Sequence, residues 1–358
     1  MNGRTFTAFG FFQNPPKVAV RTFLNAVRVG KKAVKKTEMR VGRACNPSQR
    51  CLLAAAGCHT ARMNHFWLSA VRSAAVFCVL LPAIGAVHAQ ADGAAALLDK
   101  HAALAQPLAR NPFGRPLVLE SQEANNRVTG HAYAELDFPF STVSAQFKNP
   151  HQWCEVMILH LNTKYCRASG SAGTETLKVN IGKKTPQALS DTSTLSFQFR
   201  QGEASSQFMT VNLTARDGPV GTSDYRMTLQ TAALPSGKTF VHLSYAYSYG
   251  LAGKLAMQTY LSTIGRSKVG FTSVTQKDGR NELMGGMRGT VERNTMRYYL
   301  AMEALMVSLQ EPAPVQVGKR LEYWFSATEQ YPEQLHEIDR ASYLSMKRAE
   351  LQRQQSAP

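Results

Sequence analysis

Alternation of apolar and polar residues between positions 128 and 249 is the feature that most constrains the fold of this 358-residue chain. Side chains of a half-buried strand point alternately to core and solvent, so repeated alternation predicts a sheet with one solvated face. Short polar turns, such as residues 201–203 and 235–237, leave no room for crossover helices. We therefore expect an antiparallel meander, since parallel strands need such crossovers.

Helices are predicted on both sides of this meander. Residues 92–106 are rich in Ala and Leu and predict a short helix that ends at Pro107. Shorter helical stretches are expected at 142–148, 151–160 and 251–262, and residues 268–274 return to a strand pattern. The longest helix is predicted over residues 290–310. Its apolar stripe consists of Val291, Tyr298, Met302, Leu305 and Leu309.

A helical extension is predicted after Pro312 and Pro314, which break the long helix. It covers residues 311–358 and carries aromatic residues such as Trp324 and Phe325 on charged helices. Docking of these aromatic side chains on the preceding domain is the favoured interpretation. A dimer contact or a membrane contact remains the alternative.

The order strand, two short helices, long meander and final long helix resembles the START/Bet v 1-like (SRPBCC) superfamily over about residues 117–310. The resemblance implies an α+β helix-grip fold, with a curved antiparallel sheet around a long C-terminal amphipathic helix. It also implies an apolar cavity for a lipid, sterol or polyketide-like ligand. The extra helix after Gly250 and the helical tail depart from the family's pattern.

The candidate binding residues surround a strand in which three tyrosines, Tyr245, Tyr247 and Tyr249, share the apolar face. Their rings offer apolar surface to a ligand and their hydroxyls can bind its polar end. Plain core packing is the competing interpretation. The full set of predicted ligand-binding residues is Leu213, Met227, Tyr245, Tyr247, Tyr249, Arg288, Tyr298 and Met302.

Charged residues cluster at the start of the long helix. Arg288 or Arg297 would meet a carboxylate or phosphate at the mouth of the cavity. A solvated helix face, on which Glu292, Arg293 and Arg297 form surface pairs, is the competing interpretation. No catalytic motif and no metal-ligand spacing is present, so neither a catalytic residue, a metal nor a cofactor is predicted.

Residues 63–89 have the pattern of a signal peptide. A lightly basic start precedes an apolar run from Ala74 to Val87. Small residues at positions −3 and −1, Val87 and Ala89, precede the expected cleavage site before Gln90. The run is short for a membrane span and contains Pro82. We therefore expect an exported, periplasmic protein that begins near Gln90.

Residues 1–62 contain 12 Lys or Arg and one acidic residue, and are interpreted as a mis-assigned start or a disordered segment. A basic nucleic-acid arm or an organellar transit segment are the alternatives. Of the net charge of +17, residues 90–358 contribute only +5, from 28 basic and 23 acidic residues. Nucleic acid is therefore not an expected partner, whereas weak attraction to anionic membrane headgroups stays open.

Cysteine usage agrees with export, because only Cys154 and Cys166 follow the expected cleavage site. In an oxidising compartment they can form one disulfide, which is worth about 3 kcal/mol in the chain-entropy model. Two buried free thiols are the alternative.

The sequence thus divides into residues 1–62, a signal peptide at 63–89, a short helix and linker at 90–116, the helix-grip domain at 117–310 and the tail at 311–358. The expected function is binding of a hydrophobic or amphipathic small molecule, a lipid above all, between the sheet and the last helix. A cyclase- or hydrolase-like enzyme and a ligand-free periplasmic interaction protein are the alternatives.

Overall fold

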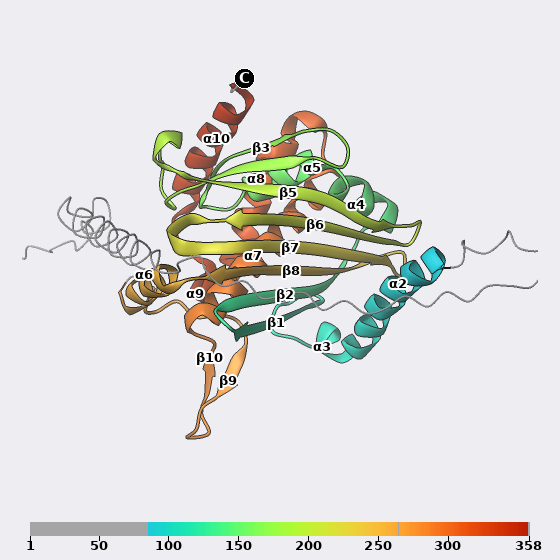
Figure 1. Ribbon diagram of the computed structural model, residues 1–358, viewed down its shortest axis with the longest axis horizontal. Helices are drawn as coiled ribbons and strands as arrows, with labels where there is room; N and C mark the ends of the chain where they lie inside the picture. The colour runs from blue at the N-terminus through green and yellow to red at the C-terminus, as the bar shows by residue number, and fades with distance from the viewer. Residues whose placement is uncertain (1–84, 264, 357–358) are drawn as a thin grey trace, which may run out of the picture. The chain divides into compact units, whose positions relative to one another are not determined.

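Eight antiparallel strands form one sheet in the computed structural model, which describes residues 85–263 and 265–356 (Figure 1). Their order is β1-β2-β8-β7-β6-β5-β4-β3. The strands are β1 (Leu117–Ala124), β2 (Arg127–Leu136), β3 (Thr163–Ser169), β4 (Thr176–Ile181), β5 (Ser193–Ala204), β6 (Phe208–Asp217), β7 (Thr222–Ala233) and β8 (Thr239–Tyr249). The predicted meander is confirmed, and residues 1–84, with the basic segment and most of the expected signal peptide, lie outside the described residues.

Helices cover both faces of this sheet. The inner face packs against α4 (Phe140–Phe147), α5 (Pro150–Met157) and α7 (Gly286–Ser308) around the larger hydrophobic core. The outer face carries α2 (Gly85–Ala103) and α3 (Ala105–Ala109), which bury a smaller apolar cluster that includes Tyr133, Phe208 and Phe240. Long α7 against a curved antiparallel sheet is the helix-grip arrangement, and the α+β fold class is confirmed.

The long helix is not amphipathic as expected, because α7 is buried on nearly all sides. Met302 and Leu305 are fully buried as predicted, but Arg293 and Arg297, expected on a solvated face, are each only 3% exposed. The cause is α8 (Ala313–Glu329), whose Trp324 is 1% exposed and donates from Nε1 to the Arg297 carbonyl at 3.1 Å. The interpretation of these arginines as surface ion pairs is therefore wrong.

Two predicted boundaries are also wrong. Pro107 does not end a helix but lies in the first turn of α3. Proline is tolerated there because the N–H groups of the first turn have no partner within the helix. Residues 268–274 do not rejoin the main sheet. Only β9 (Ser273–Thr275) forms there, and it pairs with β10 (Asn281–Leu283) in a separate two-stranded hairpin.

The tail docks through a buried group that we call the lysine–glutamate cluster: Lys164 of β3 with Lys347 and Glu350 of α10 (Arg340–Ser356). Lys164 Nζ and Lys347 Nζ lie 3.0 and 2.8 Å from separate oxygens of the Glu350 carboxylate. Lys347 also donates to the carbonyls of His160 and Thr163, at 2.7 and 2.8 Å. These contacts join the last helix to the domain.

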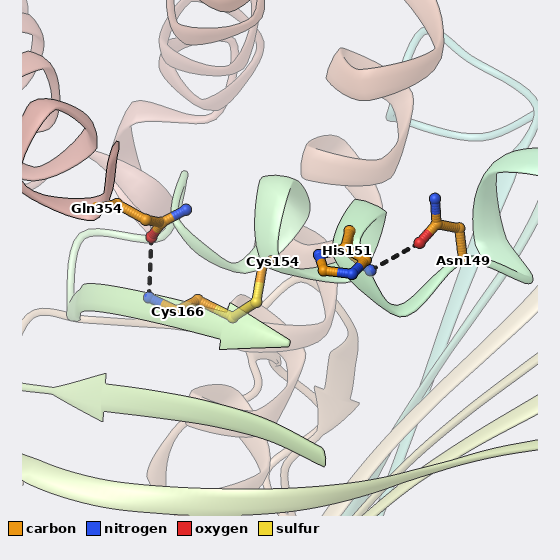
Figure 2. The surroundings of a disulfide bond; sticks show 5 residues. All are labelled: Asn149, His151, Cys154, Cys166 and Gln354. Carbon is orange, nitrogen blue, oxygen red and sulfur yellow. Dashed lines mark hydrogen bonds between the residues drawn. A yellow bond between two sulfur atoms is a disulfide. The ribbon is translucent and has the colours of Figure 1, made fainter. Parts of the chain in front are cut away.

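A disulfide joins α5 to β3 beside this cluster, with Cys154 Sγ and Cys166 Sγ 1.98 Å apart (Figure 2). The Cys166 N–H donates to the side chain of Gln354 on α10 at 2.9 Å. Asn149 caps α5 by accepting from the His151 N–H at 2.9 Å, which places Pro150 in the first helical turn.

Candidate ligand-binding site

Four tyrosines from three elements meet between the sheet and α7, and we call them the tyrosine cluster: Tyr225 of β7, Tyr245 and Tyr247 of β8, and Tyr298 of α7. The ring centres of Tyr225 and Tyr247 lie 5.4 Å apart in a stacked arrangement, and those of Tyr245 and Tyr298 lie 5.3 Å apart. Tyr245 and Tyr247 share this face because they are two residues apart in one strand.

Three hydroxyls of the cluster have no hydrogen-bond partner among the described residues. Tyr225 donates to Thr222 Oγ1 at 2.8 Å, but the described residues offer no hydrogen bond to the hydroxyls of Tyr245, Tyr247 or Tyr298. Among the described residues, three polar side-chain atoms are sealed from solvent and have no hydrogen-bond partner: Arg115 Nε, Thr231 Oγ1 and Arg297 Nε. The three free hydroxyls are not among them, so each borders accessible space although Tyr245 is 7% and Tyr247 4% exposed.

Burial keeps these phenols neutral. It raises the pKa of Tyr245 well above its ordinary value, and it also raises the pKa values of Tyr247 and Tyr298. The charge of Arg293 acts on Tyr247 in the opposite direction, which places a cation near the cluster. A neutral phenol both donates and accepts a hydrogen bond, so the cluster can bind a ligand of either polarity.

Cations outnumber carboxylates beside the cluster. Arg293 donates to the Val269 carbonyl at 3.1 Å, and Arg297 donates to Glu337 Oε1 at 2.9 Å. Lys184 Nζ lies 2.6 Å from the same Glu337 oxygen. Burial would raise the pKa of Glu337, but the charges of Lys184 and Arg297 outweigh it and lower that pKa. Lys184 and Arg297 therefore share one carboxylate, and Arg293 has no ion-pair partner among the described residues.

His160 packs against the tyrosine cluster at Tyr298. Its ring centre lies 5.3 Å from that of Tyr298. Burial, and then the charge of Arg297, hold the pKa of His160 well below its usual range, so the imidazole is neutral.

The other predicted binding residues have different positions. Tyr249 faces the same side as Tyr247, but its hydroxyl donates to Glu123. Burial of Tyr249 and its hydrogen bond with Glu123 raise the pKa of Tyr249 to about 12. Arg288 does not join the cluster, because its guanidinium donates to the Ser121 carbonyl at 2.8 Å. Leu213, Met227 and Met302 are buried members of the main hydrophobic core, at most 1% exposed.

Two hollows formed by described residues lie elsewhere. One of about 340 Å³ is lined by Asn111, Arg115 and their neighbours, and one of about 300 Å³ lies where α7 and α8 meet, with Glu311 and Lys319. Neither includes a predicted ligand-binding residue. The candidate site therefore rests on the accessible space beside the tyrosine cluster. Among the described residues, no group of His, Cys, Asp or Glu could hold a metal ion.

Sequence reasoning missed several members of this site. Tyr225 lies within the alternating pattern but carries no further signal, and His160 and Lys184 carry no signal of their own. Arg293 and Arg297 were visible as a cluster on the long helix, but their burial depends on α8, which covers them from a distant part of the sequence.

No protein-family model and no curated protein matches the chain. Similar solved structures include norcoclaurine synthase from Thalictrum flavum, at 11% identity over 55% of this chain and 98% of that one, with a TM-score of 0.31. An aromatase/cyclase from Streptomyces sp. R1128 has 7% identity over 56% and 94%, with a TM-score of 0.28. A conserved protein of unknown function from Enterococcus faecalis has 8% identity over 66% and 89%, with a TM-score of 0.26. At these scores, the fold assignment rests on the sheet topology and α7.

Proposed function

We propose that the protein is an exported, periplasmic START/Bet v 1-like protein that binds an amphipathic small molecule, a lipid, between the sheet and α7. The observation that carries this proposal is the set of hydroxyls of Tyr245, Tyr247 and Tyr298, which have no hydrogen-bond partner among the described residues and are not sealed from solvent. Buried polar groups are normally hydrogen-bonded, so unbonded ones mark a place that a ligand or water completes.

The ligand's polar end is expected to be acidic. Arg297 and Lys184 share the carboxylate of Glu337, and Arg293 has no ion-pair partner among the described residues. A carboxylate or phosphate beside these groups would form charge-assisted hydrogen bonds, while the alkyl or ring part contacts the tyrosine rings. Of the two arginines expected to bind an anion, this assignment keeps Arg297 and drops Arg288, and it adds Arg293.

Native mass spectrometry of protein recovered from an exporting host tests the proposal. We expect a bound small molecule that is released on unfolding. Rebinding should weaken about fivefold in Tyr247→Phe, through the loss of one hydrogen bond of about 1 kcal/mol. Tyr133→Phe, on the outer face of the sheet, is the matched control and should bind normally. Protein that carries no small molecule would leave the ligand-free interaction protein. Equal affinities of the two variants for a recovered ligand would remove Tyr247 from the site.

Export has its own test. N-terminal sequencing of the same protein should find Gln90 as the first residue. An intact chain that begins at Met1 in the cytoplasm would contradict both export and the periplasmic assignment.

An enzyme of cyclase or hydrolase type is the second candidate, and one observation favours it. Neutral His160 lies against the ring of Tyr298, so a proton acceptor and a phenol converge on the proposed site. Incubation of the identified ligand with the protein decides between the two. Chemical conversion that is abolished in His160→Asn would favour the enzyme, whereas recovery of unchanged ligand favours the binding protein.

A further inference from the structure

The three most exposed large apolar side chains of the described residues gather at one place. Leu251 is 74% exposed, Val220 66% and Leu255 51%. Leu251 and Leu255 lie one turn apart on the same face of α6 (Leu251–Ser262), and Val220 lies in the short turn η2 (Pro219–Gly221) that contacts this helix. We call these three residues the α6 corner; α6 is labelled in Figure 1.

Backbone atoms make the contact between α6 and the η2 turn, and Leu251 and Leu255 are not needed for it. At Gly253 an added Cβ would lie 3.1 Å from the Gly221 oxygen, so helix and turn meet at a glycine. The Gly250 N–H also donates to the Gly221 carbonyl at 2.9 Å. Val220 has a φ of 54°, which is a costly conformation for a β-branched residue. Leu251 and Leu255 are therefore left to face outward, beside a strained and exposed valine.

The charge around the α6 corner is positive. Residues 250–268 contain the exposed Lys254 and Arg266 and no Asp or Glu, whereas Lys268 donates to the His336 carbonyl. The turn between β6 and β7 is neutral, because Arg216 and Arg226 balance Asp217 and Asp224. Exposed leucines on a short helix flanked by cations match the chemistry of an anionic bilayer surface, where apolar side chains enter the headgroup region and cations meet the phosphates.

We propose that the α6 corner docks the protein on an anionic phospholipid bilayer. The docking proposal is argued from the exposure and charge of the α6 corner. It rests on the proposed function only for its purpose, which is the passage of a lipid ligand between the bilayer and the binding site. The helix also contacts α7, which carries Arg293 and Arg297.

Sedimentation with vesicles tests the docking. Protein purified after expression of the full chain is mixed with vesicles of phosphatidylglycerol in phosphatidylcholine, or of phosphatidylcholine alone. We expect binding to the anionic vesicles, lowered about tenfold in the Leu251→Ser, Leu255→Ser double variant. Val315→Ser with Val317→Ser, which changes the exposed valines of α8, is the matched control and should bind as the parent protein does.

Each other outcome is decisive. Equal vesicle binding by the α6 variant and the parent protein overturns the proposal, as does a dimer in solution that the same variant dissociates, which would assign the surface to a second copy. Native mass spectrometry separates this test from the proposed function. If the α6 variant loses vesicle binding but retains the ligand, both proposals are supported. If the parent protein binds vesicles but carries no ligand, the docking proposal is supported and the lipid-binding function is contradicted.

Discussion

The molecule buries two polar groups on the inner side of its sheet, and they differ in how their hydrogen bonds are completed. In the lysine–glutamate cluster, Lys347 donates to two carbonyls and to Glu350, and Lys164 donates to the same carboxylate. In the tyrosine cluster, the hydroxyls of Tyr245 and Tyr247 have no protein partner among the described residues. A polar group that is complete holds the structure together, and one that is incomplete is available to a ligand.

The largest expected effect comes from breaking the complete cluster. Glu350→Gln leaves Lys164 and Lys347 buried without an anion, and removal of one partner of a buried ion pair costs about 3–5 kcal/mol. The free energy of unfolding in urea measures this loss. Exposed Glu333→Gln in the neighbouring short helix is the control and should change stability little. A loss below about 1 kcal/mol for Glu350→Gln would mean that the cluster does not hold the tail.

The disulfide beside that cluster should contribute next. Replacement of Cys154 and Cys166 by Ala removes a crosslink between residues 12 apart, worth about 3 kcal/mol in the chain-entropy model. Urea unfolding with and without a reducing agent measures the same effect in the parent protein. If the reducing agent leaves the stability of the parent protein unchanged, the two sulfurs are not bonded in solution.

The lysines should also make stability depend on pH. Burial lowers the pKa of Lys347 to about 8, while the unfolded chain keeps the ordinary value near 10.4. The unfolded chain thus binds more protons between these values, so stability should rise with pH, by about 1–2 kcal/mol from pH 8 to about pH 9.5. Lys347→Met should flatten this rise. A stability that falls over this interval, or a slope that Lys347→Met leaves unchanged, would contradict the assignment.

The smallest expected effect sharpens the comparison itself. Tyr343 is fully buried and donates to the Leu159 carbonyl at 3.1 Å, so Tyr343→Phe should lose about 1 kcal/mol of stability in the ligand-free protein. Tyr247→Phe removes a hydroxyl that has no partner in the described part of the chain and should leave the stability of that protein nearly unchanged. Equal losses in the two variants would show that the Tyr247 hydroxyl is bonded within the protein after all.

The fold was largely predictable because alternation with a period of two is a local signal. It placed Tyr245, Tyr247 and Tyr249 on one face, next to Leu213 and Met227 across the strands, as the register confirms. The site was less predictable because hydrogen bonding depends on distant residues. Tyr249 differs from Tyr247 only through Glu123 on β1, and that contact has no trace in the strand pattern.

The helices show the same limit. The stripe on α7 indicated which side meets the sheet, but the burial of Arg293 and Arg297 requires α8 to cover the opposite side. Docking of the tail also requires the pairing of Lys164 with a carboxylate near the end of the chain. Such contacts between distant segments cannot be read from a single sequence, whereas periodicity can.

The most direct test of the binding site is a crystal structure of the protein purified from an exporting host without removal of lipid. We predict non-protein density in contact with the hydroxyls of Tyr245, Tyr247 and Tyr298, with its polar end beside Arg293. A structure in which protein side chains fill this space, and bond these three hydroxyls, would contradict the account.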